Sequence, residues 1–185
     1  MQTTRQREKD RKKEQGELMQ LVGFVTGKEH FGVDILMVQE IIRMAPITSV
    51  PNAPGFIEGV INLRGRIIPI IDLRRRLGLS GGKMAGAEST RILIVNVDER
   101  VTGFIVDSVT KVMKIEVSDI EPPPDIVVAG LKSKYIRGVC EIDGRLLILL
   151  DFSRILQVRE AEELESFQDR KERTQPQRAH ALVNG

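Results

Sequence analysis

An internal repeat is the feature of this sequence that most limits how the chain can fold. Residues 56–77 (FIEGVINLRGRIIPIIDLRRRL) align without a gap with residues 135–156 (YIRGVCEIDGRLLILLDFSRIL), and eight of the 22 positions are identical. A shorter similarity relates FGVD at residues 31–34 to FIVD at residues 104–107, in the same order along the chain. We therefore expect one structural unit that is built twice.

The repeated unit consists of short β-strands. Residues 21–27 and 29–35, and again residues 91–97 and 100–107, are rich in β-branched and aromatic side chains and meet at turn residues, which predicts one hairpin in each half. A glycine-rich stretch at residues 78–89 is typical of a linker between the halves. Because two copies are too few for a solenoid, the sequence predicts an all-β protein of two small antiparallel β-barrels.

Short helices are expected between the strands. Residues 36–44 carry apolar side chains at helical spacing and end before Pro46, which predicts a short helix. Asp72 and Asp151 occupy equivalent repeat positions after a strand, where each carboxylate is expected to cap a helical turn rather than to act in acid–base catalysis. Residues 153–171 predict a charged helix at the C-terminal end of the folded part.

The two ends of the chain differ from its middle. Residues 1–17 and 157–185 are so charged and so poor in apolar side chains that they bury too little surface to offset the entropy lost on ordering. We predict a flexible N-terminal extension and a charged C-terminal helix and tail. The folded part is then residues 18–156, with a first barrel at about 18–84 and a second at about 88–156, with or without an exchange of terminal strands.

Charge and cysteine content restrict the kinds of partner and compartment. Lysines and arginines total 28 against 26 acidic residues, so a net charge of +2 creates no global attraction to nucleic acid or membrane. The single cysteine, Cys140, cannot form an internal disulfide, and no signal-peptide pattern is present at the N-terminus, which favours a reducing cytoplasm. No apolar run approaches the roughly 20 residues that cross a bilayer.

Residues suited to catalysis or metal binding are few. His30 and His180 lie in a predicted turn and a predicted tail, where neither forms a nucleophile–base pair. One cysteine and two distant histidines do not supply a common metal site, and GLSGGKM at residues 78–84 lacks the spacing and the hydroxyl of a phosphate loop. We predict no enzyme activity, no cofactor and no metal site.

An arginine cluster lies in and after the first repeat hairpin. The cluster consists of Arg64, Arg66 and Arg74 to Arg76. Arg64 is predicted at the hairpin tip with its side chain pointing outward, and Arg74 to Arg76 on the exposed turns of a short helix. The cluster keeps a nucleic-acid-binding SH3-like barrel protein as the alternative function. The chain offers few aromatic side chains on which bases could stack, so a solvated face is the favoured interpretation.

Four motifs together resemble the CheW family of chemotaxis coupling proteins. They are VDILMVQEII at residues 33–42, PNAPGFIEGVINLRGRIIPIIDLR at 51–74, RVTGFIVDSVTKV at 100–112 and GRLLILLDFSRIL at 144–156. The resemblance covers about residues 18–156. It implies a pair of five-stranded SH3-like antiparallel β-barrels with short connecting helices, a C-terminal helix and a hydrophobic groove between the barrels.

The resemblance also implies a function. Members of this family are non-enzymatic cytoplasmic scaffolds that link the cytoplasmic tips of transmembrane chemoreceptors to the regulatory domain of the histidine kinase CheA. They assemble with both partners into membrane-associated arrays, so that membrane contact is indirect and no nucleic acid is involved.

Six residues match family positions that bind the receptor or the kinase. These are Ile35, Val38, Glu40, Arg64, Val109 and Val112. The four apolar residues either line the groove, where they would receive a helical receptor hairpin, or belong to the ordinary core. Glu40 and Arg64 are expected to add charged contacts that set register more than affinity.

Overall fold

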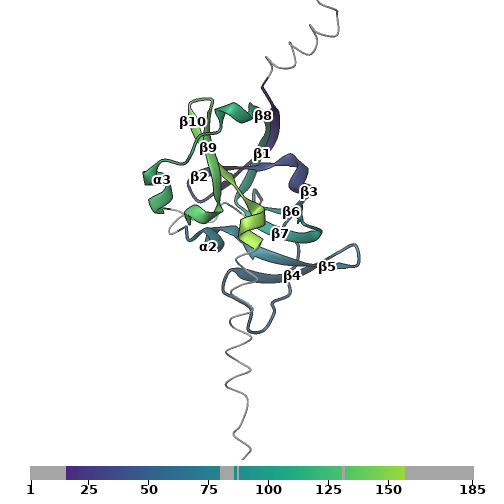
Figure 1. The fold of residues 1–185 in the computed structure, drawn as a ribbon. Helices are drawn as coiled ribbons and strands as arrows, with labels where there is room; N and C mark the ends of the chain where they lie inside the picture. The colour runs from purple at the N-terminus through teal and green to yellow at the C-terminus, as the bar shows by residue number, and fades with distance from the viewer. Residues whose placement is uncertain (1–15, 80–85, 87, 131, 157–185) are drawn as a thin grey trace, which may run out of the picture.

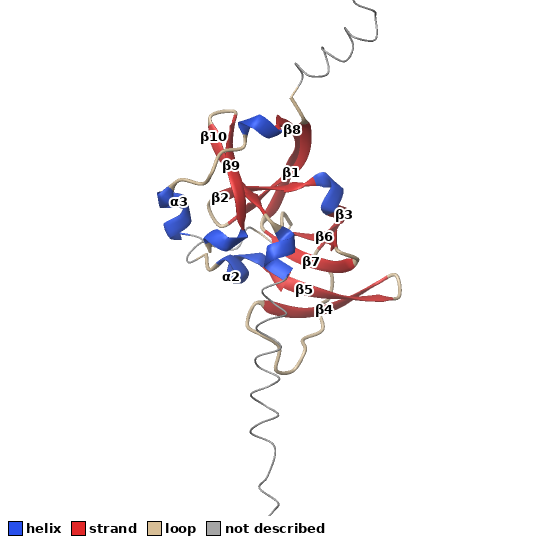
Figure 2. Ribbon diagram, viewed as in Figure 1, coloured by secondary structure: helices blue, strands red, loops and turns tan. Residues whose placement is uncertain are grey.

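The computed structural model describes residues 16–79, 86, 88–130 and 132–156, and the described chain folds into two five-stranded sheets joined by short helices (Figures 1 and 2). The strands are β1 (Leu18–Thr26), β2 (Glu29–Asp34), β3 (Val38–Arg43), β4 (Ile57–Leu63), β5 (Arg66–Asp72), β6 (Arg91–Val97), β7 (Arg100–Val106), β8 (Ser108–Glu116), β9 (Ile136–Ile142) and β10 (Arg145–Leu150). The helical segments are η1 (Ile35–Met37), α2 (Leu73–Leu77), η2 (Val117–Asp119), α3 (Asp125–Gly130) and η3 (Ser133–Tyr135), with a last helical turn at residues 152–156.

Each sheet closes into a barrel. The strand order is β8-β1-β2-β10-β9 in one sheet, here called the β1 barrel, and β3-β6-β7-β5-β4 in the other, the β6 barrel. A bridge between Glu121 and Val139 joins the chain beyond β8 to β9, and a bridge between Thr48 and Val60 joins the chain beyond β3 to β4. The expected pair of five-stranded barrels is confirmed, with one parallel pairing in each barrel, β2 with β10 and β5 with β7.

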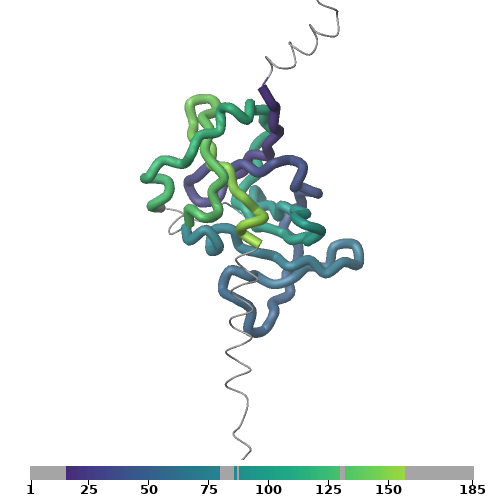
Figure 3. Tube along the Cα trace, in the orientation of Figure 1, coloured from purple at the N-terminus to yellow at the C-terminus, as the bar shows by residue number. Residues whose placement is uncertain are grey.

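The two halves of the sequence exchange their first hairpins. β1 and β2 pair with the three C-terminal strands, whereas β6 and β7 pair with β3, β4 and β5. The sequence left such an exchange open, and each barrel draws strands from both of the ranges 18–84 and 88–156. The physical reason is the shortness of the connections: η1 is three residues long, and the strand that follows it continues into the neighbouring barrel (Figure 3).

The predicted helix at residues 36–44 is wrong. Only the 3-10 turn Ile35–Met37 is helical, and Val38–Arg43 forms β3, which pairs antiparallel with β6. Burial alternates along β3, but Glu40 stands at a half-buried position and Ile41 at an exposed one, so the apolar side chains do not follow the two-residue period and imitate the pattern of a helix. Pairing with β6 decides the conformation.

The two barrels share one apolar core. Buried side chains of the β1 barrel, such as Phe24 and Phe31, belong to the same cluster as Leu93 and Phe104 of the β6 barrel. Two smaller clusters fill the individual barrels. Because burial of apolar surface is the main stabilising contribution, the shared cluster holds the barrels together as one body.

The two repeat aspartates cap equivalent helical turns, as predicted. The backbone N–H of Arg75 donates to Asp72 Oδ1 at 3.2 Å, and that of Arg154 donates to Asp151 Oδ1 at 3.1 Å. Each arginine also lies near the oxygen Oδ2 of its own capping residue, at 3.4 and 3.3 Å. These aspartates therefore stabilise the two copies of the repeat.

The predicted exposed face of Arg74 to Arg76 is wrong. Arg76 is 1% exposed and its Nη2 donates to the carbonyl of Ile155 at 2.9 Å. The Arg74 side chain is 15% exposed and pairs with Asp107 at 2.5 Å, so that Arg75 alone of the three is exposed. The reason is that α2 packs against the shared core through Leu73 and Leu77, which turns neighbouring side chains inward. The predicted N-terminal extension, most of the linker and the tail beyond residue 156 lie outside the described residues.

Candidate partner-binding surface

Two of the predicted residues, Glu40 and Arg64, form a bidentate ion pair. Glu40 lies on β3, and Arg64 lies at the tip of the β4–β5 hairpin. Arg64 Nη1 donates to Glu40 Oε1 at 2.7 Å, and Nη2 donates to Oε2 at 2.9 Å. The Arg64 side chain is still 73% exposed. The fork-to-fork geometry therefore fixes the orientation of an arginine that a partner can reach, whereas the sequence predicted a side chain free of local contacts.

The backbone of Arg64 is in the left-handed region. Its φ is 51° and that of the following Gly65 is 82°, and Gly65 N–H donates to Asn62 Oδ1 at 2.8 Å. Asparagine, aspartate and glycine adopt this conformation readily, but for arginine it costs about 1 kcal/mol or more. An arginine at this position is consistent with selection for its side chain rather than for the turn.

Pairing changes the pKa of both residues. The hydrogen bond from Arg64 lowers the pKa of the Glu40 carboxyl below its ordinary value of 4.5, and the hydrogen bond to Glu40 raises the pKa of the Arg64 guanidinium. A carboxyl with a lowered pKa stabilises the folded state above its ordinary pKa, and this contribution is lost as the pH falls through the lowered value. The pair is therefore intact at neutral pH.

Replacing Arg64 by glutamine is expected to raise the pKa of Glu40 toward 4.5, because the charged hydrogen-bond donor is lost. An NMR titration of the Glu40 side-chain carboxyl carbon measures this shift. Arg75→Gln on α2 is the matched control and should leave Glu40 unchanged. An identical Glu40 titration in Arg64→Gln and wild type would show that the pair does not form in solution.

The other hairpin tip carries an ion pair of opposite polarity. Lys111 Nζ on β8 donates to Asp143 Oδ2 at the β9–β10 tip, at 2.8 Å. The hydrogen bond from Lys111 is the main cause that lowers the pKa of Asp143. Asp143 also has a positive φ, 53°. The two tips therefore share a backbone conformation and a pairing but differ in the sign of the charge they display.

The strand partners of the two tips are equivalent as well. Val38 pairs with Val95 and Ile41 with Leu93 across one bulge, and Val109 pairs with Phe24 and Val112 with Val22 across the other. With the bulges superimposed, Glu40 corresponds to Lys111. Both copies of the repeat thus have an ion pair between a strand, β3 or β8, and a hairpin tip, and both charges of the pair are reversed between the copies.

The four predicted apolar residues fall into two groups. Ile35, Val38 and Val109 are half-buried and pack against the shared core, whereas Val112 on β8 is 56% exposed. The structure thus brings three of them to the junction of the barrels and leaves Val112 open to solvent. Three members therefore contact the core, and the groove-lining role of the set stays a prediction.

Sequence reasoning missed two exposed leucines beside Ile35. Leu36 is 89% exposed and Leu18 is 62% exposed, and both line a cavity of about 390 Å³ with Ile35. The backbone N–H of Leu36 donates to Asp34 Oδ1 at 3.0 Å, which turns the leucine outward at the start of η1. The signal was present in the sequence, since Asp34 is a capping residue directly before the apolar stretch. Adjacent exposed apolar side chains mark an interaction surface.

The described residues offer little for metal or thiol chemistry. No cluster of three or more His, Cys, Asp and Glu side chains that could hold a metal occurs among the described residues. Burial, followed by the charge of Asp119, raises the pKa of the Cys140 thiol, which makes this cysteine a poor nucleophile. None of the helices in the described ranges is both long enough and apolar enough to pass through a bilayer.

Two interlocked five-stranded barrels, with exposed apolar side chains and an oriented arginine at a hairpin tip, place the chain in the class of proteins built from two SH3-like barrels. The chain belongs to the CheW family, because residues 20–160 match the CheW-like domain.

Named relatives support this assignment. The chain is 40% identical to chemotaxis protein CheW of Klebsiella aerogenes over 72% of its length and 78% of the relative. It is 35% identical to chemotaxis protein CheW of Treponema pallidum over 80% and 88%, and 33% identical to protein FrzA of Myxococcus xanthus over 72% and 82%. The crystal structure of the scaffolding protein TtCheW from Thermoanaerobacter tengcongensis is similar with a TM-score of 0.67 and 36% identity, over 74% of this chain and 86% of that one.

Proposed function

We propose that this protein is a non-enzymatic scaffold of bacterial chemotaxis that couples chemoreceptors to the histidine kinase CheA. The observation that carries the proposal is the match of residues 20–160 to the CheW-like domain, together with relatives named chemotaxis protein CheW and a similar structure described as a scaffolding protein. Its partners are the cytoplasmic receptor tips and the regulatory domain of CheA. The protein works in the cytoplasm and reaches membrane-associated arrays through the receptors.

The surface offers two kinds of contact to these partners. Leu18, Ile35, Leu36 and Val112 provide apolar area, on which a receptor helix can lay its own apolar stripe. Arg64, held by Glu40, provides a directional charged group. Burial of the apolar area supplies affinity, and the oriented charge selects the partner and its register.

The nucleic-acid alternative loses its main support. Of the five arginines of the cluster, Arg76 is buried and Arg74 is paired with Asp107, while Arg64 and Arg75 are exposed but paired with Glu40 and Glu58, and Arg66 is exposed. Because four of the five are buried or matched by a carboxylate, the cluster attracts phosphate weakly.

Pairwise binding tests this function. The chain is expected to bind the isolated CheA regulatory domain and, separately, membranes that contain a chemoreceptor, as measured by calorimetry and co-sedimentation. A tenfold rise in salt concentration should lower the affinity for either partner only modestly, since buried apolar area provides most of the affinity. Binding to single-stranded or duplex oligonucleotides with a steep salt dependence, and to neither protein, would refute the proposal.

A further inference from the structure

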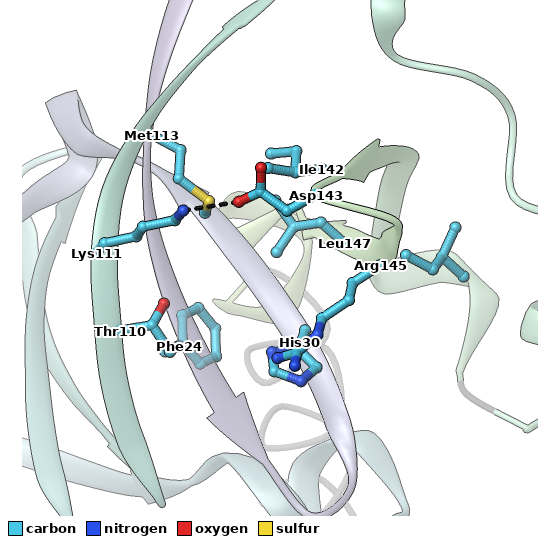
Figure 4. Close-up of a pocket in the computed structure, with 10 residues that line it drawn as sticks. Phe24, His30, Thr110, Lys111, Met113, Ile142, Asp143, Arg145 and Leu147 are labelled. Atoms are coloured by element: carbon cyan, nitrogen blue, oxygen red, sulfur yellow. Dashed lines mark hydrogen bonds and ion pairs between the residues drawn. The ribbon is translucent and has the colours of Figure 1, made fainter.

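The β1 barrel contains a second pocket, whereas the Glu40–Arg64 pair lies on the β6 barrel. It has a volume of about 490 Å³ and lies between β8, the β1–β2 hairpin and the β9–β10 hairpin (Figure 4). Phe24, Met113 and Leu147 supply apolar lining, and Leu146, which is 43% exposed, lies at its edge. Both the size and the apolar lining match those of pockets that bind ligands at the mouths of β-barrels.

Basic side chains predominate among the charged groups of this pocket. His30, Lys111 and Arg145 come from three different strands, β2, β8 and β10, and Asp143 is the only carboxylate among the lining residues. Lys111 and Asp143 are joined across the pocket, as the dashed line in Figure 4 shows. The charge of Arg145 helps to lower the pKa of the Asp143 carboxyl, and the Arg145 side chain extends over the pocket toward His30 (Figure 4).

The charged groups are arranged differently in the other barrel. At the equivalent positions of the β6 barrel, Val101 replaces His30, Glu40 replaces Lys111 and Arg64 replaces Asp143, whereas Arg66 corresponds to Arg145, as the strand registers and the repeat align them. The backbone frame is the same in both barrels, so the difference lies in side chains that face the pocket. A ligand that recognises these groups would distinguish one barrel from the other.

We propose that this pocket binds an acidic peptide segment of a partner protein, with a large apolar side chain inserted beside Phe24 and Leu147 and a carboxylate paired with Arg145. The apolar insertion follows from the lining, and the carboxylate follows from the exposed guanidinium of Arg145 and the neighbouring His30 and Lys111. The proposal is independent of the function assigned to the Glu40–Arg64 surface, because it concerns the other barrel and requires neither receptor nor kinase.

A designed hexapeptide, acetyl-Asp-Glu-Leu-Phe-Glu-Asp-amide, tests the proposal on the full chain by NMR titration of backbone amides. We expect saturable shifts centred on β2, β8 and the β9–β10 tip. Two analogues separate the contributions: one with lysine in place of each acidic residue, and one with serine in place of leucine and phenylalanine. Each analogue should bind at least about tenfold more weakly than the parent hexapeptide.

Matched variants assign the binding to the pocket. Arg145→Glu and Leu146→Glu should each weaken the hexapeptide about tenfold, whereas Arg66→Glu and Ile67→Glu, at the equivalent positions on β5, should not. All four positions are exposed, so the amide spectrum should show that the fold is kept. Absence of saturable shifts in wild type, equal binding of the lysine analogue, or equal loss in the β5 controls would overturn the proposal.

Discussion

Arg64→Asp is expected to abolish receptor-dependent activation of CheA while the fold stays intact. The substitution removes both hydrogen bonds to Glu40 and places a second carboxylate beside it. The turn itself should tolerate aspartate, because Asp143 adopts nearly the same φ in the sister hairpin, 53° against 51°. The charge reversal also places like charges opposite one another wherever a partner carboxylate faces Arg64, which costs several kcal/mol of binding, or about thirtyfold or more in affinity. CheA autophosphorylation in a reconstituted receptor membrane measures the effect.

Asp143→Arg is the matched control at the other tip. It breaks the pair with Lys111, but both of those side chains are largely exposed, so little stability should be lost. Kinase activation should change less than about twofold, which corresponds to under 0.5 kcal/mol. Normal activation and normal co-sedimentation of Arg64→Asp, or equal damage by Asp143→Arg, would contradict the assigned asymmetry of the tips.

Arg76→Ala is expected to lower the free energy of unfolding by about 3 kcal/mol, the largest stability effect of the changes considered. The Arg76 guanidinium lies 4.2 Å from the ring centre of Phe56 and 5.2 Å from that of Tyr135, and it donates to the Ile155 carbonyl. Phe56 and Tyr135 are equivalent in the repeat, as are Arg76 and Ile155. Arg76 thus joins the two halves of the repeat at their junction, and its truncation removes a charged hydrogen bond, two cation–π contacts and buried volume.

Urea denaturation followed by circular dichroism measures this change. Arg75→Ala is the neighbouring control: its side chain is 56% exposed, and loss of its pair with Glu58 should cost under about 1 kcal/mol. An Arg76→Ala variant as stable as Arg75→Ala would show that the buried guanidinium contributes nothing to the junction.

The repeat unit was predictable because its identical residues act locally. Gly65 and Gly144 both have positive φ at a hairpin tip, and Asp72 and Asp151 both cap the turn that follows. Such residues specify structure within a few positions of themselves, so their recurrence in the sequence was enough to indicate two equivalent units.

The assembly of the two units was not predictable in the same way. Whether β3 pairs with its own half or with β6 depends on contacts between segments far apart in the sequence, and the polar Glu40 at a half-buried position hid the strand pattern. The three arginines of α2 are adjacent in sequence, yet only the packing of α2 on the shared core separates the buried Arg76 from the exposed Arg75.

The ion pairs of the site were only partly predictable from the sequence. Glu40 and Arg64 were both predicted as site residues, but their contact joins a strand to a hairpin 24 residues away. The sequence analysis did not pair the corresponding Lys111 and Asp143. The reason is that the difference in residue number between equivalent positions of β3 and β8 is not the same as that between the two hairpins. A search for opposite charges at both offsets would have found the reversed pair.

Formation of the ternary complex tests the central claim most directly. Membranes that contain a chemoreceptor are sedimented with CheA, with and without this protein, and the CheA in the pellet is measured. We expect CheA to sediment with the membranes in the presence of the wild-type chain and to remain largely in the supernatant without it or with Arg64→Asp. Equal amounts of CheA in the pellet with and without the chain would contradict its role as the coupler.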